Sequence, residues 1–378
     1  MDWKISLFKI YSDEEDIEAV NKIIRRGTYW ALGPEIEEFE EKIATYMDRR
    51  FALTFNSGTA ALHALFLAYE IKSSEVIVPS FTFIATANTV LLAGGKPIFA
   101  EIEEDSFGLN PNDVNEKITK KTKAIVPVHY GGQVCKYMKE LRELADDHNL
   151  LILEDAAESL GSKLKDTKAG NFGQSSMFSL CQNKIITTGE GGFVVTDDNA
   201  INEKLKLLRS HGRVEFLEGD YFSNTKDNEY IQIGFNMRIP TMSAALGISQ
   251  LNKIDKIAEM RRKNAFYMNE GLGKIASIKV PEEMKEAYHI YQLYTLKFDN
   301  TELRDKVQIH LTNNGIMSKI YFNPIHLKTF YMKEFGYKKG NLPITEDLSQ
   351  RILTLPMYPQ LTNEEMDYMI KTILEALK

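Results

Sequence analysis

Short apolar segments alternate with amphipathic ones along the first half of the chain, and this alternation constrains the fold more than any other feature. Apolar segments of strand length occur at Phe51–Phe55, Glu75–Pro79, Lys96–Ala100, Lys123–Val128 and Leu150–Leu153. Helical patterns such as Pro111–Ile118 and Lys136–His148 separate them. Parallel neighbours need crossover connections of this kind, whereas antiparallel hairpins do not. The pattern therefore predicts an α/β fold built on a mostly parallel sheet.

Two acids and one lysine follow buried segments in a way that indicates a ligand site. Leu150–Leu153 delivers Glu154 and Asp155 to the carboxyl end of its strand, where open α/β sheets bind their ligands. Lys184 lies between an apolar segment containing Ser179 and a glycine-rich turn, through which backbone can pass close to something bulky. Pyridoxal phosphate (PLP) explains both groups, because it forms a Schiff base with an amine and needs a carboxylate to keep its ring nitrogen protonated.

Two further motifs each allow two interpretations. The turn from Asn56 to Leu62 puts small residues at a helix N-terminus, where bare N–H groups and the helix dipole bind phosphate. An ordinary Ser or Thr helix cap would produce the same pattern. Asp155 and Glu158, three residues apart at the start of an expected helix, could both reach one ligand. Alternatively, they are an acidic cap and a first-turn residue.

Six motifs follow one another along the chain: Ser57-Gly58-Thr59, Glu154-Asp155-Ala156-Ala157-Glu158, Phe178-Ser179, Asn183-Lys184, Gly189-Glu190-Gly191-Gly192 and Gly234-Phe235-Asn236-Met237-Arg238. In this order they resemble the signatures of the DegT/DnrJ/EryC1/StrS family of PLP-dependent nucleotide-sugar aminotransferases. The resemblance extends from about Gly33-Pro34 to the C-terminal helix. It implies the aspartate-aminotransferase-like fold, PLP fold type I. A large PLP-binding domain with a mostly parallel seven-stranded sheet would span residues 1–250, and a smaller C-terminal α+β domain residues 251–378.

The resemblance also implies a role for each motif residue. Lys184 would be the catalytic residue, which carries PLP and then moves a proton between the amino donor and the cofactor. Asp155 would pair with the ring nitrogen. The other implied cofactor contacts are Ser57, Gly58, Thr59 and Ser179 at the phosphate, Phe83 stacked on the ring, Ala157, Glu158 beside the phenolic oxygen, and Asn236, which crosses to the phosphate of a neighbouring subunit. This last position implies a homodimer with shared active sites.

The implied reaction is the transfer of an amino group to a nucleotide-linked keto sugar. Glu158 and the segment around Lys184 look most like the branch of the family that aminates C4 of 4-keto-6-deoxyhexoses, with L-glutamate as donor, for the biosynthesis of amino sugars of surface polysaccharides or antibiotics. The nucleotide diphosphate needs cationic or N–H partners in an otherwise acidic protein. The candidate substrate residues are Arg213, Arg238, Tyr321 and His326.

Four alternatives are open at the level of the sequence. A 3-keto sugar aminotransferase of the same family would share these motifs. A PLP-dependent sugar dehydratase of the family has histidine where Lys184 stands, and a non-catalytic regulator would not need the lysine, aspartate and serine set. A dinucleotide-binding oxidoreductase would share the α/β pattern, but no G-x-G-x-x-G follows a strand here.

The composition limits the kinds of partner that the protein is expected to bind and the compartment in which it is expected. Against 46 Lys and Arg stand 53 Asp and Glu, and the net charge of −7 disfavours nucleic-acid binding by phosphate neutralisation. Cys135 and Cys181 form no C-x-x-C pair, so we expect no disulfide framework, no metal site and a reducing, cytoplasmic location. No signal pattern and no run of 18 apolar residues occurs, so we expect no membrane span. The polar segment Val214–Asn228 is expected to be a mobile loop near the substrate entrance.

Overall fold

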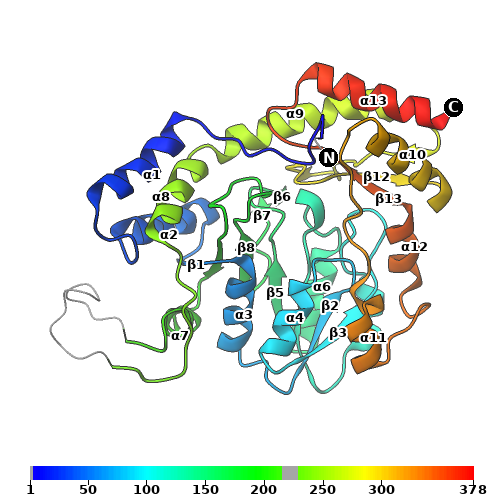
Figure 1. The fold of residues 1–378 in the computed structure, drawn as a ribbon. Coiled ribbons are helices and arrows are strands. Elements are labelled where there is room, and N and C mark those ends of the chain that lie inside the picture. The colour runs from blue at the N-terminus through cyan, green and yellow to red at the C-terminus, as the bar shows by residue number, and fades with distance from the viewer. Residues whose placement is uncertain (1–2, 215–228) are drawn as a thin grey trace.

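The structure, a computed structural model, describes residues 3–214 and 229–378 (Figure 1). Its helices are α1 (Glu14–Arg26), α2 (Pro34–Met47), α3 (Gly58–Ala68), α4 (Ala85–Leu92), α5 (Pro111–Lys117), α6 (Met138–Asp147), α7 (Asn199–Arg209), α8 (Thr241–Leu251), α9 (Ile254–Leu272), α10 (Thr301–Asn313), α11 (Thr329–Phe335), α12 (Pro343–Arg351) and α13 (Asn363–Leu377). Short 3₁₀ turns lie at Tyr130–Gly132 and Ile325–Leu327. The strands are β1 (Phe51–Phe55), β2 (Glu75–Pro79), β3 (Lys96–Ala100), β4 (Thr122–Ile125), β5 (Leu151–Asp155), β6 (Lys163–Leu164), β7 (Thr167–Lys168), β8 (Ser175–Ser179), β9 (Gly192–Thr196), β10 (Ile278–Lys279), β11 (Ala287–Tyr288), β12 (Tyr294–Phe298) and β13 (Ile352–Leu355).

Within these residues, a seven-stranded sheet forms the centre of the molecule and helices cover both of its faces. Its strand order is β1-β9-β8-β5-β4-β2-β3. The pairs from β8 to β3 are parallel, and β9 runs antiparallel to both of its neighbours. The predicted α/β fold with a mostly parallel seven-stranded sheet is therefore confirmed.

Alternation along β5 sends adjacent side chains to opposite faces of the sheet. Leu153 packs in the core beneath α3, α4 and α7, whereas Ile152 packs in the core beneath α6. Asp155 lies two residues beyond Leu153 and therefore shares its face. Glu154 shares the face of Ile152, so only one of the two adjacent acids points toward α3 and α4.

A second core lies beside the large sheet and comes mainly from the C-terminal third. Strands β10, β12 and β13 form an antiparallel sheet, which packs against α9, α10 and α13. Ile5, near the N-terminus, joins this core and pairs with Ile316. Helix α9 belongs to both cores, since Ile257 packs with the large sheet and Met268 with the small one. The domain division at residues 250 and 251 stays a prediction.

Helix α4 begins later than expected. The sequence pattern suggests a start at Ser80, but the first helical residue is Ala85. Ser80 is held outside a helix, because its carbonyl accepts the Ile325 N–H at 2.9 Å and its hydroxyl accepts the His326 N–H at 3.0 Å. A segment more than two hundred residues away thus sets the helix start.

The single helix expected from Thr241 past Lys253 is two helices, α8 and α9. The Lys253 amine lies 2.5 Å from Asp13 and 2.8 Å from Asp16, which ties the break between these helices to the start of α1. Apart from Val214, the predicted loop at 214–228 lies outside the described residues. None of the helices in the described residues has the length and apolar character needed to span a bilayer.

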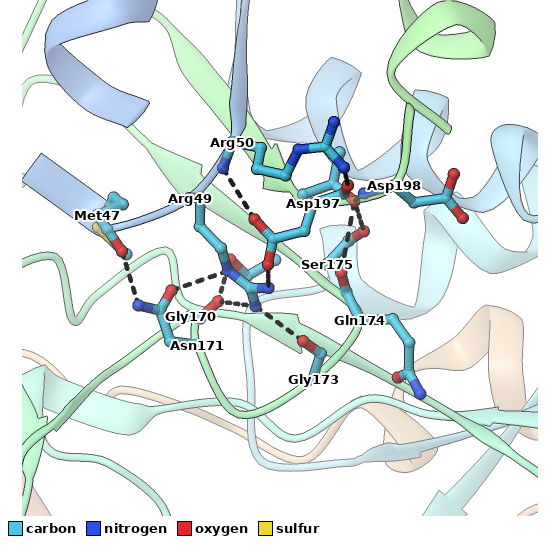
Figure 2. Close-up of polar contacts among 12 residues, drawn as sticks. Met47, Arg49, Arg50, Gly170, Asn171, Gly173, Gln174, Ser175, Asp197 and Asp198 are labelled. Carbon is cyan, nitrogen blue, oxygen red and sulfur yellow. Dashed lines mark hydrogen bonds and ion pairs between the residues drawn. The ribbon is translucent and has the colours of Figure 1, made fainter. Parts of the chain in front are cut away.

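A mostly buried arginine, Arg49, holds the sheet together at the edge where β1 and β8 begin (Figure 2). This edge lies opposite the end of β5 that carries Asp155. The Arg49 guanidinium donates to the carbonyl oxygens of Gly170 and Gly173 at 3.0 and 2.8 Å and pairs with Asp197 at 2.7 Å. From the other side, the Glu154 carboxylate accepts the N–H groups of the same two glycines at 2.8 and 2.7 Å. Glu154 is therefore a buried carboxyl group whose hydrogen bonds are already taken by structural partners.

Candidate active site

Asp155 is the last residue of β5, and only 5% of it is exposed. The Thr86 hydroxyl on α4 donates to one carboxylate oxygen at 2.8 Å, and the Ala157 N–H donates to the other at 3.2 Å. Burial raises the pKa of Asp155, and these hydrogen bonds and the charge of Lys184 offset only part of that effect. No ion pair reaches Asp155 from the described residues. The carboxylate is thus fixed in position, and a cationic ligand group would relieve the cost of its ionisation.

Lys184 lies in the irregular segment that joins β8 to β9, and it forms an ion pair beside Asp155 with Glu158, which follows β5. The lysine amine lies 3.4 Å from Glu158 Oε1, and the two side chains are 13% and 9% exposed. The other Glu158 oxygen accepts the Gly131 N–H at 2.9 Å. The Lys184 N–H donates to the Cys181 carbonyl at 2.9 Å, which anchors the backbone of the lysine. A mostly buried amine is therefore held by one carboxylate.

The helix expected to start at Asp155 does not form. Residues 156–162 are a series of turns instead. The Ala156 N–H donates to the Met177 carbonyl of β8 at 2.9 Å, so sheet pairing continues one residue beyond β5. The two predicted acids still face one site, because the turn brings Glu158 to Lys184.

The turn at Ser57 forms a tight cradle at the N-terminus of α3. The Ser57 hydroxyl caps the helix by accepting a backbone N–H at 3.0 Å, as the capping interpretation predicts. It leaves the N–H groups of Gly58 and Thr59 without partners in the described part of the chain. A Cβ atom on Gly58 would lie 3.0 Å from Ser179 Cβ, and one on Gly192 would lie 2.6 Å from Gly58 Cα. The structure thus brings the predicted phosphate residues together, with donors arranged for an anion.

Phe83 and Tyr321 are the two aromatic residues that the sequence suggests for the site. Phe83 is 59% exposed, and its ring centroid lies 6.5 Å from that of Phe322. Burial, and then the charge of Glu158, raise the pKa of Tyr321, so its hydroxyl stays protonated. The Tyr130 hydroxyl donates to the Tyr321 carbonyl at 2.6 Å. A protonated phenol is therefore available near Glu158, and an exposed ring lies next to Phe322.

Asn236, Arg238 and Arg213 form a separate group around Ser210. Asn236 pairs with Ser210 in an antiparallel bridge, and Arg238 donates to the Ser210 hydroxyl at 3.1 Å. Arg213 is 8% exposed. The group adjoins the cradle, because the Asn56 side chain donates to the Asn236 carbonyl at 3.4 Å.

A substrate role for His326 does not fit its position. The side chain is fully buried, with Nδ1 2.7 Å from the Ser80 hydroxyl and Nε2 3.1 Å from the Glu346 carboxylate. Its ring also contacts the rings of Phe99 and Tyr337. Both nitrogens are engaged, so His326 joins the 325–327 turn to α12 and has no donor left for a diphosphate.

Two residues that contact the site were not identified from the sequence: Thr86 and Gly131. Thr86 carries a weak signal, because it follows Thr82 by four residues in the sequence. In the structure the two hydroxyls are 3.0 Å apart. Gly131 acts through its backbone N–H, which donates to Glu158. Such a role requires no particular residue type, and it depends on a pairing of segments distant in sequence.

The assembled residues fit PLP. They supply an anion cradle, a buried carboxylate that no ion pair reaches from the described residues, and a mostly buried amine, which match the phosphate, the ring nitrogen and the aldehyde of that cofactor. No group of three or more His, Cys, Asp or Glu side chains in residues 3–214 and 229–378 is placed to hold a metal ion.

Comparison with known proteins agrees with this geometry. The profile of the DegT/DnrJ/EryC1/StrS aminotransferase family matches residues 11–374. The GDP-perosamine synthase of Vibrio cholerae is 35% identical over 378 residues, which cover 99% of this chain and 98% of that protein. Among solved structures, Helicobacter pylori PseC, an aminotransferase involved in the biosynthesis of pseudoaminic acid, superposes with a TM-score of 0.91 at 28% identity and covers 98% of both chains. S. venezuelae DesV, in complex with a ketimine intermediate, gives 0.89 at 30% identity and 99% of both.

Proposed function

The chain belongs to the DegT/DnrJ/EryC1/StrS aminotransferase family and is a PLP-dependent sugar aminotransferase, and from this premise we propose that it transfers an amino group from L-glutamate to C4 of a nucleotide-linked 4-keto-6-deoxyhexose. The observation that carries the proposal is the mostly buried Lys184 amine, paired with Glu158 beside the buried Asp155. The similarity to GDP-perosamine synthase along the whole chain supports a nucleotide-sugar substrate. The product would enter amino-sugar biosynthesis.

Each residue of the site would act through the chemistry of its own atoms. When bound, PLP supplies a carbonyl that captures amines and a ring that withdraws electrons. The Gly58 and Thr59 N–H groups and the Ser179 hydroxyl would bind its phosphate, and Asp155 would face its ring nitrogen. Once its amine is free, Lys184 would move a proton to and from the α-carbon of the amino donor.

Glu158 and the aromatic side chains would complete the pocket. Glu158 lies 3.4 Å from the lysine amine and would orient it between proton transfers. Phe83 would stack on the ring, and the protonated Tyr321 hydroxyl would donate to the sugar. Arg213 and Arg238 are the proposed partners of the diphosphate, since an acidic protein must supply local positive charge there.

The position of amination can be tested directly. Pure protein loaded with PLP is incubated with L-glutamate and a matched panel of 3-keto and 4-keto nucleotide sugars, and the products are analysed by mass and NMR. We expect 2-oxoglutarate and an amine at C4 in equal amounts. An amine only at C3, or only on a sugar without a nucleotide, would contradict the substrate proposal and leave the aminotransferase assignment standing.

We also propose a homodimer in which Asn236 reaches the phosphate site of the partner subunit. The segment before Asn236 exposes Tyr230, Ile231 and Ile233 by 54%, 58% and 86%. Exposed apolar side chains that occur this close together in the chain are typical of an interface. A shared site would place this segment against the second subunit.

Hybrid dimers test the shared site. Lys184→Ala and Asn236→Ala should each be nearly inactive alone. When the two variants are coexpressed with different tags and the hybrid is purified, one site regains both residues, so we expect up to about half of the specific activity per dimer that the wild type has. In the matched control, the hybrid pairs Lys184→Ala with Asn112→Ala instead of Asn236→Ala, because Asn112 is at an exposed position on α5. A hybrid no more active than its parents, or a monomer active at high dilution, would be evidence against sharing.

A further inference from the structure

A glutamine far along the chain holds the peptide group from which Lys184 projects. Gln292 is 3% exposed, and its Nε2 donates to the Asn183 carbonyl at 2.6 Å. That carbonyl belongs to the same peptide plane as the Lys184 N–H, which donates to the Cys181 carbonyl. A carbonyl oxygen only accepts, so the amide nitrogen of Gln292 must face Asn183. Both polar groups of this plane are therefore fixed.

Arg261 on α9 orients Gln292 through the backbone. Arg261 is 3% exposed, and its guanidinium donates to the Tyr291 carbonyl at 3.1 and 2.9 Å and to the Gln292 carbonyl at 2.7 Å. Burial lowers the pKa of Arg261 to about 10, which still leaves it cationic at neutral pH. Within the described residues no carboxylate pairs with it. Burying a cation costs free energy, and here only carbonyl oxygens offset that cost. Moving this backbone away would leave the Arg261 donors without acceptors, so the hydrogen bonds hold the segment in place.

The backbone at Tyr291 is turned in a way that presents Gln292 to the lysine segment. Tyr291 has φ = 50°, in the left-handed region that aromatic residues seldom adopt. Its ring is fully buried and stacks on His289 with centroids 4.0 Å apart. Surrounding contacts therefore maintain a conformation that the residue would not choose alone, as is common next to functional sites.

We propose that Gln292, oriented by Arg261, is a positioning residue that fixes the backbone origin of the Lys184 side chain. The reason lies in the segment itself, because residues 180–191 form neither helix nor strand and so need tertiary contacts to hold one conformation. The amine must meet the cofactor and then the α-carbon of the donor, and a displaced backbone would misalign both. The inference rests on the proposed function of Lys184.

Gln292→Met tests the proposal, since methionine keeps the length and volume of the side chain and removes the N–H donor. We expect kcat to fall about 10²-fold, as a misplacement of about 1 Å does, while KM for both substrates changes less than about threefold. In the holoenzyme, the pH midpoint of the visible absorption band should shift. Amide exchange of the peptide containing Lys184 should be faster than in the wild type.

Gln250→Met is the matched control, because Gln250 is 1% exposed and donates to the Tyr11 carbonyl at 2.9 Å, in contact with α1. It should change stability without changing the absorbance midpoint. Arg261→Lys is the second variant in case Gln292→Met does not fold, and it should shift the same readouts to a smaller extent. Unchanged kcat, midpoint and exchange in a folded variant would overturn the inference. A wild-type protein without a lysine-bound PLP band would instead contradict the proposed function.

Discussion

Replacing Lys184 with alanine should lower turnover at least about 10⁴-fold, because the loss removes both the covalent anchor and a proton carrier, and proton transfer alone contributes up to that factor. The visible absorption band of lysine-bound PLP should disappear. The structure gives the physical reason, since this amine is mostly buried and directed by Glu158 beside Asp155. Absorbance spectra and steady-state rates with L-glutamate and a keto nucleotide sugar measure both effects.

Two further variants separate chemistry from folding in this experiment. Lys184→Arg keeps a cation beside Glu158, but a guanidinium does not form a Schiff base at neutral pH. It should therefore fold normally and be as inactive as the alanine variant. Lys204→Ala removes a surface lysine paired with Glu70 and should behave like the wild type. The assignment would be wrong if borohydride reduction still attached PLP to a fully active Lys184→Ala protein.

The sheet could be predicted, and Asp155 and Lys184 could be proposed as the catalytic pair, because their signals are local. A strand made of Leu151–Leu153 is buried for reasons visible in its residues, and its end carries Asp155 wherever the strand sits in the sheet. Lys184 is recognisable from the glycines that follow it, because few other residues permit close backbone approach. The cradle at Gly58 is readable for the same reason. These features depend on neighbours within a few residues.

The supporting contacts could not be predicted because they join segments far apart in the chain. Thr86 and Asp155 are separated by 69 residues, and Gln292 and Asn183 by 109. Each contact depends on which strands and helices become neighbours, and no local pattern states that. His326 shows the opposite error, since a histidine after a proline turn looks available until the chain that buries it is in place.

Asp155→Asn should lower kcat about 10²- to 10³-fold, the usual loss when a preorganised electrostatic contact to the reacting centre is removed. Asparagine keeps the size of the side chain and can still accept from Thr86, so the fold should be retained. The neutral asparagine amide has no negative charge with which to keep the ring nitrogen of PLP protonated. PLP should therefore remain attached to Lys184, and the absorption band should persist while turnover slows. Single-turnover rates and spectra of the same sample test both statements.

Glu154→Gln is the matched control, because it makes the same change one residue earlier on the opposite face of the sheet. Glu154 accepts backbone N–H groups of the loop that Arg49 also holds, so this variant should lower the free energy of unfolding. Its turnover per folded molecule should match the wild type. An equal loss of turnover in both variants would mean that general damage to β5, rather than a charge at the ring nitrogen, explains the effect of Asp155. Near wild-type turnover in Asp155→Asn would remove Asp155 from the chemistry altogether.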